Sequence, residues 1–486
     1  MAQILELTLN RINAAGDAVG EHPDDKRPII VADAIPGECV EIEIEDAQIA
    51  DPARSPLLGT LRCVVEASPA RVTPPCPYFG PPQPVTLPDG SVLNPDGAMR
   101  CAGCAWQHIA YDEQLNLKRQ MVVETLVDAA VFKGAVRHQR EAAERMVYDV
   151  VGLGDPNVED NEDDLPLTYG YLTQMTFRLN GRGECCLPSR SGDPGSPALL
   201  PVEFCPLHHP QLADLFSAFA VDAESGSDLA RDLIGIEMSV GGNADVVDAE
   251  HKGVVVLESR SGDAPDLELD LPVNVLLRRP KAGDLDAVEV LVGDWAYTVN
   301  WNDAQMVAYP AMGNAPLVSP HLLGDEAIGA LAGSLLELQP FEHVIHLWAG
   351  AGIVSRGIAE GAATVIAVEE GKLALAALEA NIAGADNVAL HRGPVRRVLD
   401  QLRRGEYETN VALLTPGANP VDDAVFRHLD RLGILRAAVV VEDITTLGEL
   451  IVQARAARFE LIGIQPVDLQ PQQDAVTVIV RVDRVR

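Results

Sequence analysis

The chain has 486 residues and a formal net charge of −35, because 37 Lys and Arg stand against 72 Asp and Glu. Hydrophobic residues make up 47% and charged residues 22%, a globular balance that excludes a largely disordered or collagen-like protein. The acidic excess argues against a generally basic protein that wraps nucleic acid by neutralising phosphates. Any nucleic-acid partner would have to be held by local basic pockets.

The sequence predicts neither a membrane partner nor a signal peptide. No apolar run reaches the roughly 18 residues that span a bilayer. The first residues, MAQILELTLNRINAAG, lack a charged leader followed by an apolar stretch. We therefore expect a cytoplasmic protein of about two to four domains, the number that its length suggests.

The amino-terminal residues, 1–66, alternate apolar and polar positions in short runs such as ILELTL, CVEIEIEDA and LGTLRCVVEA. This pattern predicts a small antiparallel β-barrel. Helical spacing begins at Asp112. Two later segments, 154–165 with its six acids and 188–201 with its Pro, Gly and Ser, are predicted loops. The chain from about 213 to 300 is acidic, with short β-type runs such as GVVVLES.

Eight cysteines in 486 residues are too few for a disulfide scaffold. Cys39 and Cys63 lie in strand-like runs and are predicted to be inert core thiols. The adjacent Cys185 and Cys186 follow a Gly-rich turn and suggest no particular chemistry.

The other four cysteines lie in turn-like segments. Cys101 and Cys104 form a C-x-x-C loop, which lets two thiolates reach one metal ion, and Cys76 and Cys205 are each followed by proline. Four soft thiolate ligands suit an iron–sulfur cluster or zinc, and the spacing does not choose between them. The alternative is a set of scattered free thiols.

The last 145 residues alternate apolar strands with helix-patterned stretches. Five strand-like runs (HVIHLWAG, ATVIAVEE, NVALHRG, NVALLTPG and AAVVVED) are each followed by a helical pattern, and two more strands, FELIGIQPVD and DAVTVIVRVD, close the sequence. The pattern predicts a seven-stranded, mostly parallel sheet with one antiparallel strand, an arrangement similar to that of class I methyltransferases.

Ligands of such sheets bind beyond the carboxyl ends of the first strands. Here the first strand leads into a turn that contains Gly350 and Gly352, and Glu369 ends the second strand. Glycines let backbone approach a cofactor, and the carboxylate can accept hydrogen bonds from a ribose. The three residues predict a nucleoside-type site, although tight strand–helix turns also use glycine for purely structural reasons.

Longer motifs carry a more specific resemblance. VADAIPGECVEIEI and ASPARVTPPCPYFG resemble a TRAM domain that runs into the cysteine cluster of the RNA uracil-C5 methyltransferase family. CAGCAWQHIAYDEQLNLKRQMVVETL is similar to the family's cluster loop and the helix that follows it. YGYLTQMTFRLNGRG with EFCPLHHP is similar to its central segment.

The resemblance implies a multidomain α+β and α/β protein with four regions. These are a TRAM-like, OB-like β-barrel over 1–66, a cluster-binding region over 67–210, the acidic β-rich remainder of the central domain over 211–330, and a Rossmann-like class I methyltransferase domain over 331–486.

The resemblance also implies cofactors and a substrate. In the family, four cysteines bind a [4Fe–4S] cluster, and here the matching positions are Cys76, Cys101, Cys104 and Cys205. The sheet domain binds S-adenosylmethionine, and uracil C5 in transfer or ribosomal RNA is methylated. This chain departs from the family's usual cluster spacing, because 24 residues separate Cys76 from Cys101, far more than is usual there.

The family's catalytic residues are replaced in this chain. Its nucleophile is the Cys of a Val-x-Cys-Asp/Asn-Pro segment after the fifth strand, where this chain has Glu442. Its base is the Glu of a His-x-x-His-x-Glu-like segment, where this chain has Thr477, with Asp474 and Ala475 at the His positions.

Positions near the cofactor differ as well. The family's Asp-Pro-Pro-Arg turn after the fourth strand begins here with Thr415, and the acid that starts the Gly-rich turn is His346. A family Gln that contacts the cofactor matches Gln305 in one of two possible registers.

The reaction needs a thiolate that adds to uracil C6 and a base that removes the C5 proton. A carboxylate is a far poorer carbon nucleophile, and it would repel the developing enolate. We therefore predict a catalytically inactive RNA-processing or RNA-binding homologue. The alternatives are an active RNA methyltransferase with displaced catalytic residues and an iron–sulfur redox or interaction module.

Charge weakens the RNA prediction. The segment 1–66 has 5 basic and 13 acidic residues, which would repel phosphate at long range. A local basic group lies near the fourth crossover helix, at Arg392, Arg396, Arg397, Arg403 and Arg404. A solvated helix face that balances nearby acids is an equally good interpretation.

Overall fold

The computed structural model describes most of the chain, in two compact units. The described ranges are 2–51, 53–153, 167–193, 196–221, 232–242, 253–268, 272–278, 288–301, 304–310, 319–405, 407–417 and 421–485. The first unit comprises Met1–Glu144, Cys186–Val202 and Gln470–Ala475, and the second comprises Arg145–Cys185, Glu203–Leu469 and Val476–Arg486. The predicted acidic loop, 154–165, lies outside the described residues.

The first unit begins with an eight-stranded sheet, of which β7 and β8 lie off the main path β1-β5-β6-β4-β3-β2. Its strands are β1 (Ala2–Thr8), β2 (Arg11–Ile12), β3 (Ala18–Glu21), β4 (Pro28–Val31), β5 (Cys39–Glu45), β6 (Leu57–Glu66), β7 (Val85–Thr86) and β8 (Val92–Leu93). Alternate residues of β5, Val40, Ile42 and Ile44, are fully buried in one core cluster. Alternation of this kind buries one face of a strand. The predicted strand runs are therefore observed, and closure of the sheet into a barrel stays a prediction.

The placement predicted for Cys39 and Cys63 is wrong, because both thiols are partly exposed. The residues of β5 that point into the core are Val40 and every second residue after it, so Cys39 lies on the opposite face. The Cys39 Sγ lies 3.6 Å from Glu6 Oε1, on the more exposed side of the sheet. The period of two residues places Cys39 on the outer face of β5. For Cys63, the register of the β5–β6 pairing shifts between Leu61 and Cys63, and Val64 is buried in its place.

The rest of the first unit is built from short hairpins and helices. The hairpin β7 (Val85–Thr86) and β8 (Val92–Leu93) joins the edge of β6, and the helices are α1 (Asp46–Ala50), α2 (Tyr111–Asp128) and α3 (Val136–Met146). The loop predicted over 188–201 is instead a hairpin of β11 (Cys185–Asp193) and β12 (Ser196–Pro201). Its Pro- and Gly-rich sequence hid the strands, and the register shifts between Pro188 and Gly192.

A segment from near the carboxyl terminus, Gln470–Ala475, belongs to the first unit because α2 binds it. Gln114 of α2 donates to Gln472 Oε1 at 2.9 Å and accepts from the Gln472 backbone N–H at 3.0 Å. The buried Lys118 donates to the Gln470 carbonyl at 2.9 Å and lies over the Trp106 ring. Buried polar groups of one helix thereby hold this distant segment in place.

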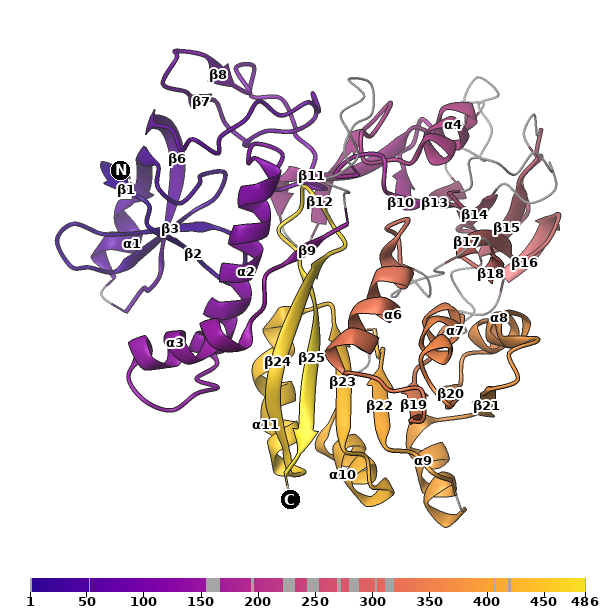
Figure 1. The fold of residues 1–486 in the computed structure, drawn as a ribbon. Helices are drawn as coiled ribbons and strands as arrows, with labels where there is room; N and C mark the ends of the chain where they lie inside the picture. Colours follow the sequence, from indigo (N-terminus) through magenta and orange to yellow (C-terminus); the bar gives the residue numbers. More distant parts are fainter. Residues whose placement is uncertain are drawn as a thin grey trace. The chain divides into compact units, whose positions relative to one another are not determined.

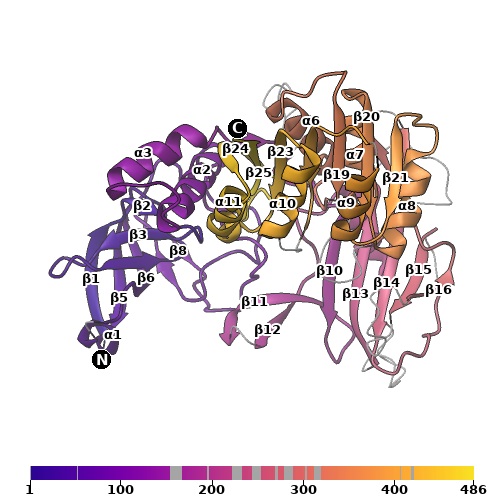
Figure 2. The same ribbon diagram turned by 90° about the horizontal axis from the view of Figure 1, so that it is seen from below.

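The central part of the second unit is β-rich, as the short apolar runs predict. Figure 2 shows β10 (Gln174–Leu179), β13 (Leu233–Val240), β14 (Gly253–Ser259), β15 (Asn274–Arg278) and β16 (Val288–Val292) side by side in this order. The helix α4 (Pro210–Ala218) and the hairpin β17 (Tyr297–Trp301) and β18 (Ala304–Ala308) complete this part.

The carboxyl-terminal sheet has the order β21-β20-β19-β22-β23-β25-β24-β9 (Figure 1). Its strands are β19 (His343–Leu347), β20 (Thr364–Glu369), β21 (Val388–Arg392), β22 (Val411–Leu414), β23 (Arg436–Val441), β24 (Phe459–Asp468), β25 (Thr477–Arg484) and β9 (Val151–Gly152). The first five are parallel to one another, and β25 runs antiparallel to both of its neighbours. The strands fall on the predicted runs, but the sheet has eight strands in the described ranges instead of seven. A two-residue strand such as β9 leaves no periodic signal.

Helices lie in two groups beside this sheet (Figure 1). One group is α6 (Gly324–Leu335), α7 (Ile353–Glu360) and α8 (Lys372–Ile382), and the other is α9 (Val395–Arg404), α10 (Asp423–Leu432) and α11 (Leu447–Ala456). A short 3₁₀ turn, η1 (Ile444–Thr446), precedes α11. None of the helices in the described ranges is long and apolar enough to span a bilayer.

A buried ion pair gives a first prediction. Glu38 is fully buried and accepts from the Arg71 Nε at 2.6 Å and Nη2 at 2.8 Å, whereas Glu43 pairs with Arg62 at the surface. Removing one partner of a buried pair leaves an uncompensated charge. We expect Glu38→Ala to lower the opening free energy of 1–66 by about 3–5 kcal/mol, and the control Glu43→Ala by at most about 1 kcal/mol. Native-state hydrogen exchange measures both, and equal losses would contradict the account.

Candidate active site

The glycine-rich turn connects β19 to α7 at the carboxyl end of the sheet. Trp348, Gly350 and Gly352 have φ values of 57°, 55° and 85°, in the left-handed region. A Cβ on Gly352 would lie 2.3 Å from Leu378 Cδ1, so only glycine fits between the turn and α8. Glycine adopts this conformation without the strain that other residues incur.

The carboxylate of Glu369 is bound to this turn. Its Oε2 accepts from the Gly350 N–H at 2.9 Å, and its Oε1 accepts from the Gly371 N–H at 2.8 Å. The structure therefore brings Gly350, Gly352 and Glu369 together at the ends of β19 and β20, as the sequence predicts. Their role in holding a cofactor stays a prediction.

Gln305 lies on a different element from Gly350, Gly352 and Glu369. It is exposed on β18, opposite Asn300 in the hairpin. The residue that links β18 to the turn is Asn381 of α8, whose side chain donates to the carbonyls of Val307 at 2.9 Å and Ala351 at 2.8 Å and accepts from the Val307 N–H at 2.7 Å. Sequence reasoning missed Asn381, although a polar residue on the apolar face of a helical run signals a buried hydrogen-bonding role.

His346 lies fully buried beneath the turn, between two hydroxyl groups. Its Nδ1 is 2.7 Å from the Ser355 Oγ, and its Nε2 is 2.9 Å from the Thr415 Oγ1. Burial lowers the pKa of His346 to about 3, so the imidazole is neutral. The Thr415 hydroxyl also donates to the Trp348 carbonyl at 2.7 Å, which fixes the backbone of the turn. An uncharged series of hydrogen bonds thus runs through His346 and Thr415, the two positions where the resemblance predicts acids.

Glu442 follows β23 directly and is exposed. Partial removal from water raises its pKa. It lies near Asp325 of α6, whose pKa is raised to about 6, first by burial and then by the Glu442 charge. The Asp325 Oδ2 accepts from the Ser319 N–H at 3.1 Å. The end of β23, where the resemblance predicts the family's thiol, therefore carries Glu442 with a second carboxyl group nearby.

Thr477 begins β25 and pairs with Val467 of β24. It is buried within the sheet, with 4% of its surface exposed. A hydroxyl cannot take up a proton near neutral pH as a carboxylate can. Thr477, which the resemblance matches to the family's base, therefore cannot act as one.

The predicted cluster cysteines divide between the two units. Cys76, Cys101 and Cys104 belong to the first and Cys205 to the second. Burial raises the pKa of Cys101, the Cys76 charge raises it further, and Arg190 opposes this shift, so the first two thiols are neighbours beside a cation. Within the described part of the chain, no three His, Cys, Asp or Glu side chains gather closely enough to hold a metal ion. The four-cysteine cluster stays a prediction.

Arg190 organises the surroundings of these thiols. Its guanidinium donates to the Cys104 carbonyl at 2.9 Å, forms an ion pair with Asp33 and lies over the Phe79 ring. Cys185 and Cys186 are buried, and their assignment to different units leaves their role open.

The predicted basic group is reduced by ion pairs. Arg392 pairs with Glu379, and Arg396 pairs with Asp422. Three arginines of α9 remain exposed: Arg397, Arg403 and Arg404. The interpretation as a charge-balanced helix face therefore holds for two of the five residues.

The buried imidazole predicts a pH dependence of stability. The folded-state pKa of His346 is about 3, whereas an unfolded histidine has an ordinary value of about 6.5. Between these values the unfolded chain binds a proton that the folded chain does not, so folding stability falls as the pH falls from about 6.5 towards 3. His346→Gln removes up to about 1.4 kcal/mol per pH unit of this slope.

Thermal unfolding of the variant between pH 4.5 and 7.5 measures this slope. The control is His343→Gln on the same strand, where the partly exposed ring bonds the Thr364 hydroxyl at 2.8 Å. An unchanged slope in His346→Gln would show that the imidazole does not titrate in this way.

The comparisons with known proteins agree along the whole chain. An uncharacterized RNA methyltransferase of Gloeobacter violaceus is 23% identical over 517 residues, which cover 99% of this chain and 97% of that protein. The 23S rRNA (uracil(1939)-C(5))-methyltransferase RlmD of Shewanella amazonensis is 29% identical over 120 residues, 25% of this chain and 21% of that protein. No family model matches the chain.

A solved structure shares the fold. It is the tRNA (uracil-54, C5)-methyltransferase of Pyrococcus abyssi in complex with S-adenosyl-L-homocysteine, with a TM-score of 0.63 and 12% identity. The similarity covers 98% of this chain and 100% of that chain. This chain is thus similar over its full length to proteins named RNA methyltransferases and shares the fold of a uracil-C5 methyltransferase.

Proposed function

We propose that this protein is an RNA-binding homologue within its family that does not methylate uracil. The observation that carries the proposal is the joint replacement of nucleophile and base, by the exposed Glu442 and the buried Thr477. Addition to C6 and removal of the C5 proton are consecutive steps, so the loss of either stops the reaction.

The charges near Glu442 also disfavour methylation of uracil. Thiolate addition places negative charge on the uracil ring, and a site that stabilises such charge needs donors or cations. Glu442 and Asp325 instead present two carboxyl groups with raised pKa values. When either is ionised, it disfavours the developing enolate.

The cofactor proposed for the turn is S-adenosylmethionine, which supplies an electrophilic methyl group when bound. Gly350 and Gly352 would let the turn approach it, and Glu369 would accept its hydrogen bonds. The uncharged His346 and Thr415 replace acids of the family, and Glu369 already accepts the Gly350 N–H. We therefore propose that binding is retained but weakened.

RNA, transfer or ribosomal, is the proposed partner. The exposed arginines of α9, Arg397, Arg403 and Arg404, are the candidates for phosphate contacts. The remainder of the chain is acidic, so affinity is expected to depend on few phosphates and to show a shallow salt dependence.

A [4Fe–4S] cluster on Cys76, Cys101, Cys104 and Cys205 is proposed from the family resemblance. The neighbouring Cys76 and Cys101 thiols and the nearby Arg190 support it, because a cation favours the thiolate form that ligates iron. Such a cluster would be structural in this chain, since the proposed function includes no redox step.

A second candidate function is methyl transfer to a nitrogen or oxygen atom of RNA. Asp325, with a pKa of about 6, could accept a proton near neutral pH, and such transfer needs no thiolate nucleophile. This candidate keeps the cofactor and changes the acceptor atom.

Turnover on RNA distinguishes these functions. With unmodified transcripts and labelled S-adenosylmethionine, we expect no S-adenosylhomocysteine release above a protein-free control, because the C6 nucleophile is missing. The Glu442→Cys variant should also stay inactive, since the C5 proton still lacks a base. Formation of 5-methyluridine by the natural chain would overturn the proposal, and label on another atom would establish the second candidate.

Metal analysis tests the cluster. Protein purified without oxygen is expected to contain about four irons and four sulfides per chain, and Cys101→Ser should lose most of them. Cys63→Ser is the control, because that thiol lies on β6 of the same unit. Zinc without sulfide would change the identity of the metal, and an iron content unaffected by Cys101→Ser would remove the site.

A further inference from the structure

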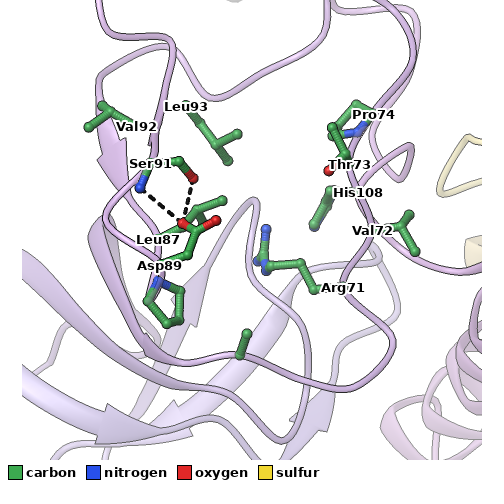
Figure 3. A pocket seen from close by; sticks show the side chains of 12 residues that line it. Arg71, Val72, Thr73, Pro74, Leu87, Asp89, Ser91, Val92, Leu93 and His108 are labelled. Carbon is green, nitrogen blue, oxygen red and sulfur yellow. Dashed lines mark hydrogen bonds between the residues drawn. The ribbon is translucent and has the colours of Figure 1, made fainter.

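A pocket of about 490 Å³ lies within the first unit, away from the turn at β19. Figure 3 shows its two facing walls, one from the segment after β6 and one from the β7–β8 hairpin. Its lining residues are Ala67, Arg71, Val72, Thr73, Pro74, Leu87, Pro88, Asp89, Ser91, Val92, Leu93 and His108. The volume is within the usual range for small-molecule sites.

One wall of this pocket comes from the long interval between two cysteines. The hairpin residues 85–93 lie among the 24 residues that separate Cys76 from Cys101. The pocket therefore depends on a feature in which this chain departs from its family, and the activity proposed above makes no use of it.

His108 gives the pocket an unsatisfied hydrogen-bonding group. Only 2% of its surface is exposed, and neither ring nitrogen has a partner among the described residues. Burial, with the charges of Arg71 and Arg190, lowers the pKa of His108 well below its ordinary value. A neutral imidazole offers one N–H donor and one acceptor nitrogen. A buried donor or acceptor that lacks a hydrogen-bond partner lowers the stability of the folded protein.

The two charged side chains of the pocket, Arg71 and Asp89, already have hydrogen-bond partners. The Arg71 side chain extends towards the hairpin (Figure 3), but its Nε and Nη2 are bound to the fully buried Glu38. Asp89 accepts from the N–H and hydroxyl of Ser91, at 2.9 and 2.6 Å, which lowers its pKa and keeps it ionised. An anionic ligand would meet this carboxylate without a free opposing charge.

The remaining walls are largely apolar, with Val72, Pro74, Leu87, Val92 and Leu93. Such walls favour a flat, uncharged body, and a neutral imidazole pairs with a group that both donates and accepts. Nitrogen heterocycles of the nucleobase type combine these two properties.

We propose that this pocket binds a nucleobase, with the His108 ring bonding its polar edge and the hairpin covering its face. The base could come from a free nucleoside or from a single RNA strand. The proposal is independent of the turn at β19, since every lining residue belongs to the first unit.

Binding is measured on the full chain by isothermal calorimetry and saturation-transfer NMR. The probes are adenosine, guanosine, cytidine and uridine, each at up to about 5 mM, and a mixed-sequence pentaribonucleotide. We expect at least one nucleoside to bind. A free nucleoside is the source if the pentanucleotide binds no more tightly, and a strand is the source if it binds at least about tenfold more tightly.

Two variants test the location. Val92→Trp fills the pocket from the hairpin and should weaken binding at least about tenfold, whereas Val65→Trp on β6 should leave it unchanged. Val65 is a matched control for Val92, because 40% and 41% of their surfaces, respectively, are exposed. His108→Phe keeps a ring of similar shape and removes both nitrogens, so it should weaken binding without lowering the melting temperature of the free protein.

Three results would overturn the proposal: no binding of any probe, binding that neither Val92→Trp nor His108→Phe weakens, or equal weakening by Val65→Trp. Methyl transfer is not measured in any of these experiments, so the result does not depend on whether the chain is an enzyme.

Discussion

A neutral imidazole held between two hydroxyl groups sets the geometry of the proposed cofactor site. The His346 ring forms hydrogen bonds with the hydroxyl groups of Ser355 in α7 and Thr415 after β22. The Thr415 hydroxyl in turn donates to the Trp348 carbonyl. One buried ring thereby ties together a strand, a helix start and the left-handed turn that contains Gly350. His346, Ser355 and Thr415 bond one another and the Trp348 carbonyl, so this series of hydrogen bonds needs no charged group.

The ends of two neighbouring strands also carry residues of a different chemical type from those that the resemblance predicts. After β23, Glu442 stands where the resemblance predicts a thiol, and at the start of β25 the buried Thr477 stands where it predicts a carboxylate. At His346, Thr415 and Thr477, the resemblance predicts acids and this chain has none, whereas Glu442 adds an acid where the resemblance predicts a thiol. These changes leave the sheet intact, since Thr477 still pairs with Val467 in the ladder. The proposed loss of uracil methylation is therefore compatible with an intact methyltransferase-like fold.

Much of the carboxyl-terminal fold follows from the order of apolar runs, because buried parallel strands and amphipathic helices leave strong periodic patterns. Gly350, Gly352 and Glu369 could be predicted because they stand at fixed places on that pattern. The β11–β12 hairpin and the two-residue β9 could not, since proline, glycine and short length hide a strand.

Contacts between distant residues escaped sequence reasoning for a different reason. The bonds from His346 to Ser355 and Thr415 span 9 and 69 residues, and no local period links such positions. The pocket around His108 is built from turns and a short hairpin, so it too has no period to announce it. The partly exposed Cys39 shows that an apolar run does not tell which face of a strand reaches the core.

The central claim is that no thiolate in this protein adds to uracil C6. RNA that contains 5-fluorouridine tests it directly, because the fluorine at C5 cannot leave as a proton does, so a C6 adduct formed with S-adenosylmethionine persists. The account predicts no covalent protein–RNA complex on a denaturing gel, with either the natural chain or Glu442→Ala. A complex whose cross-linked peptide contains Cys185 or Cys186 would contradict it and identify a displaced nucleophile.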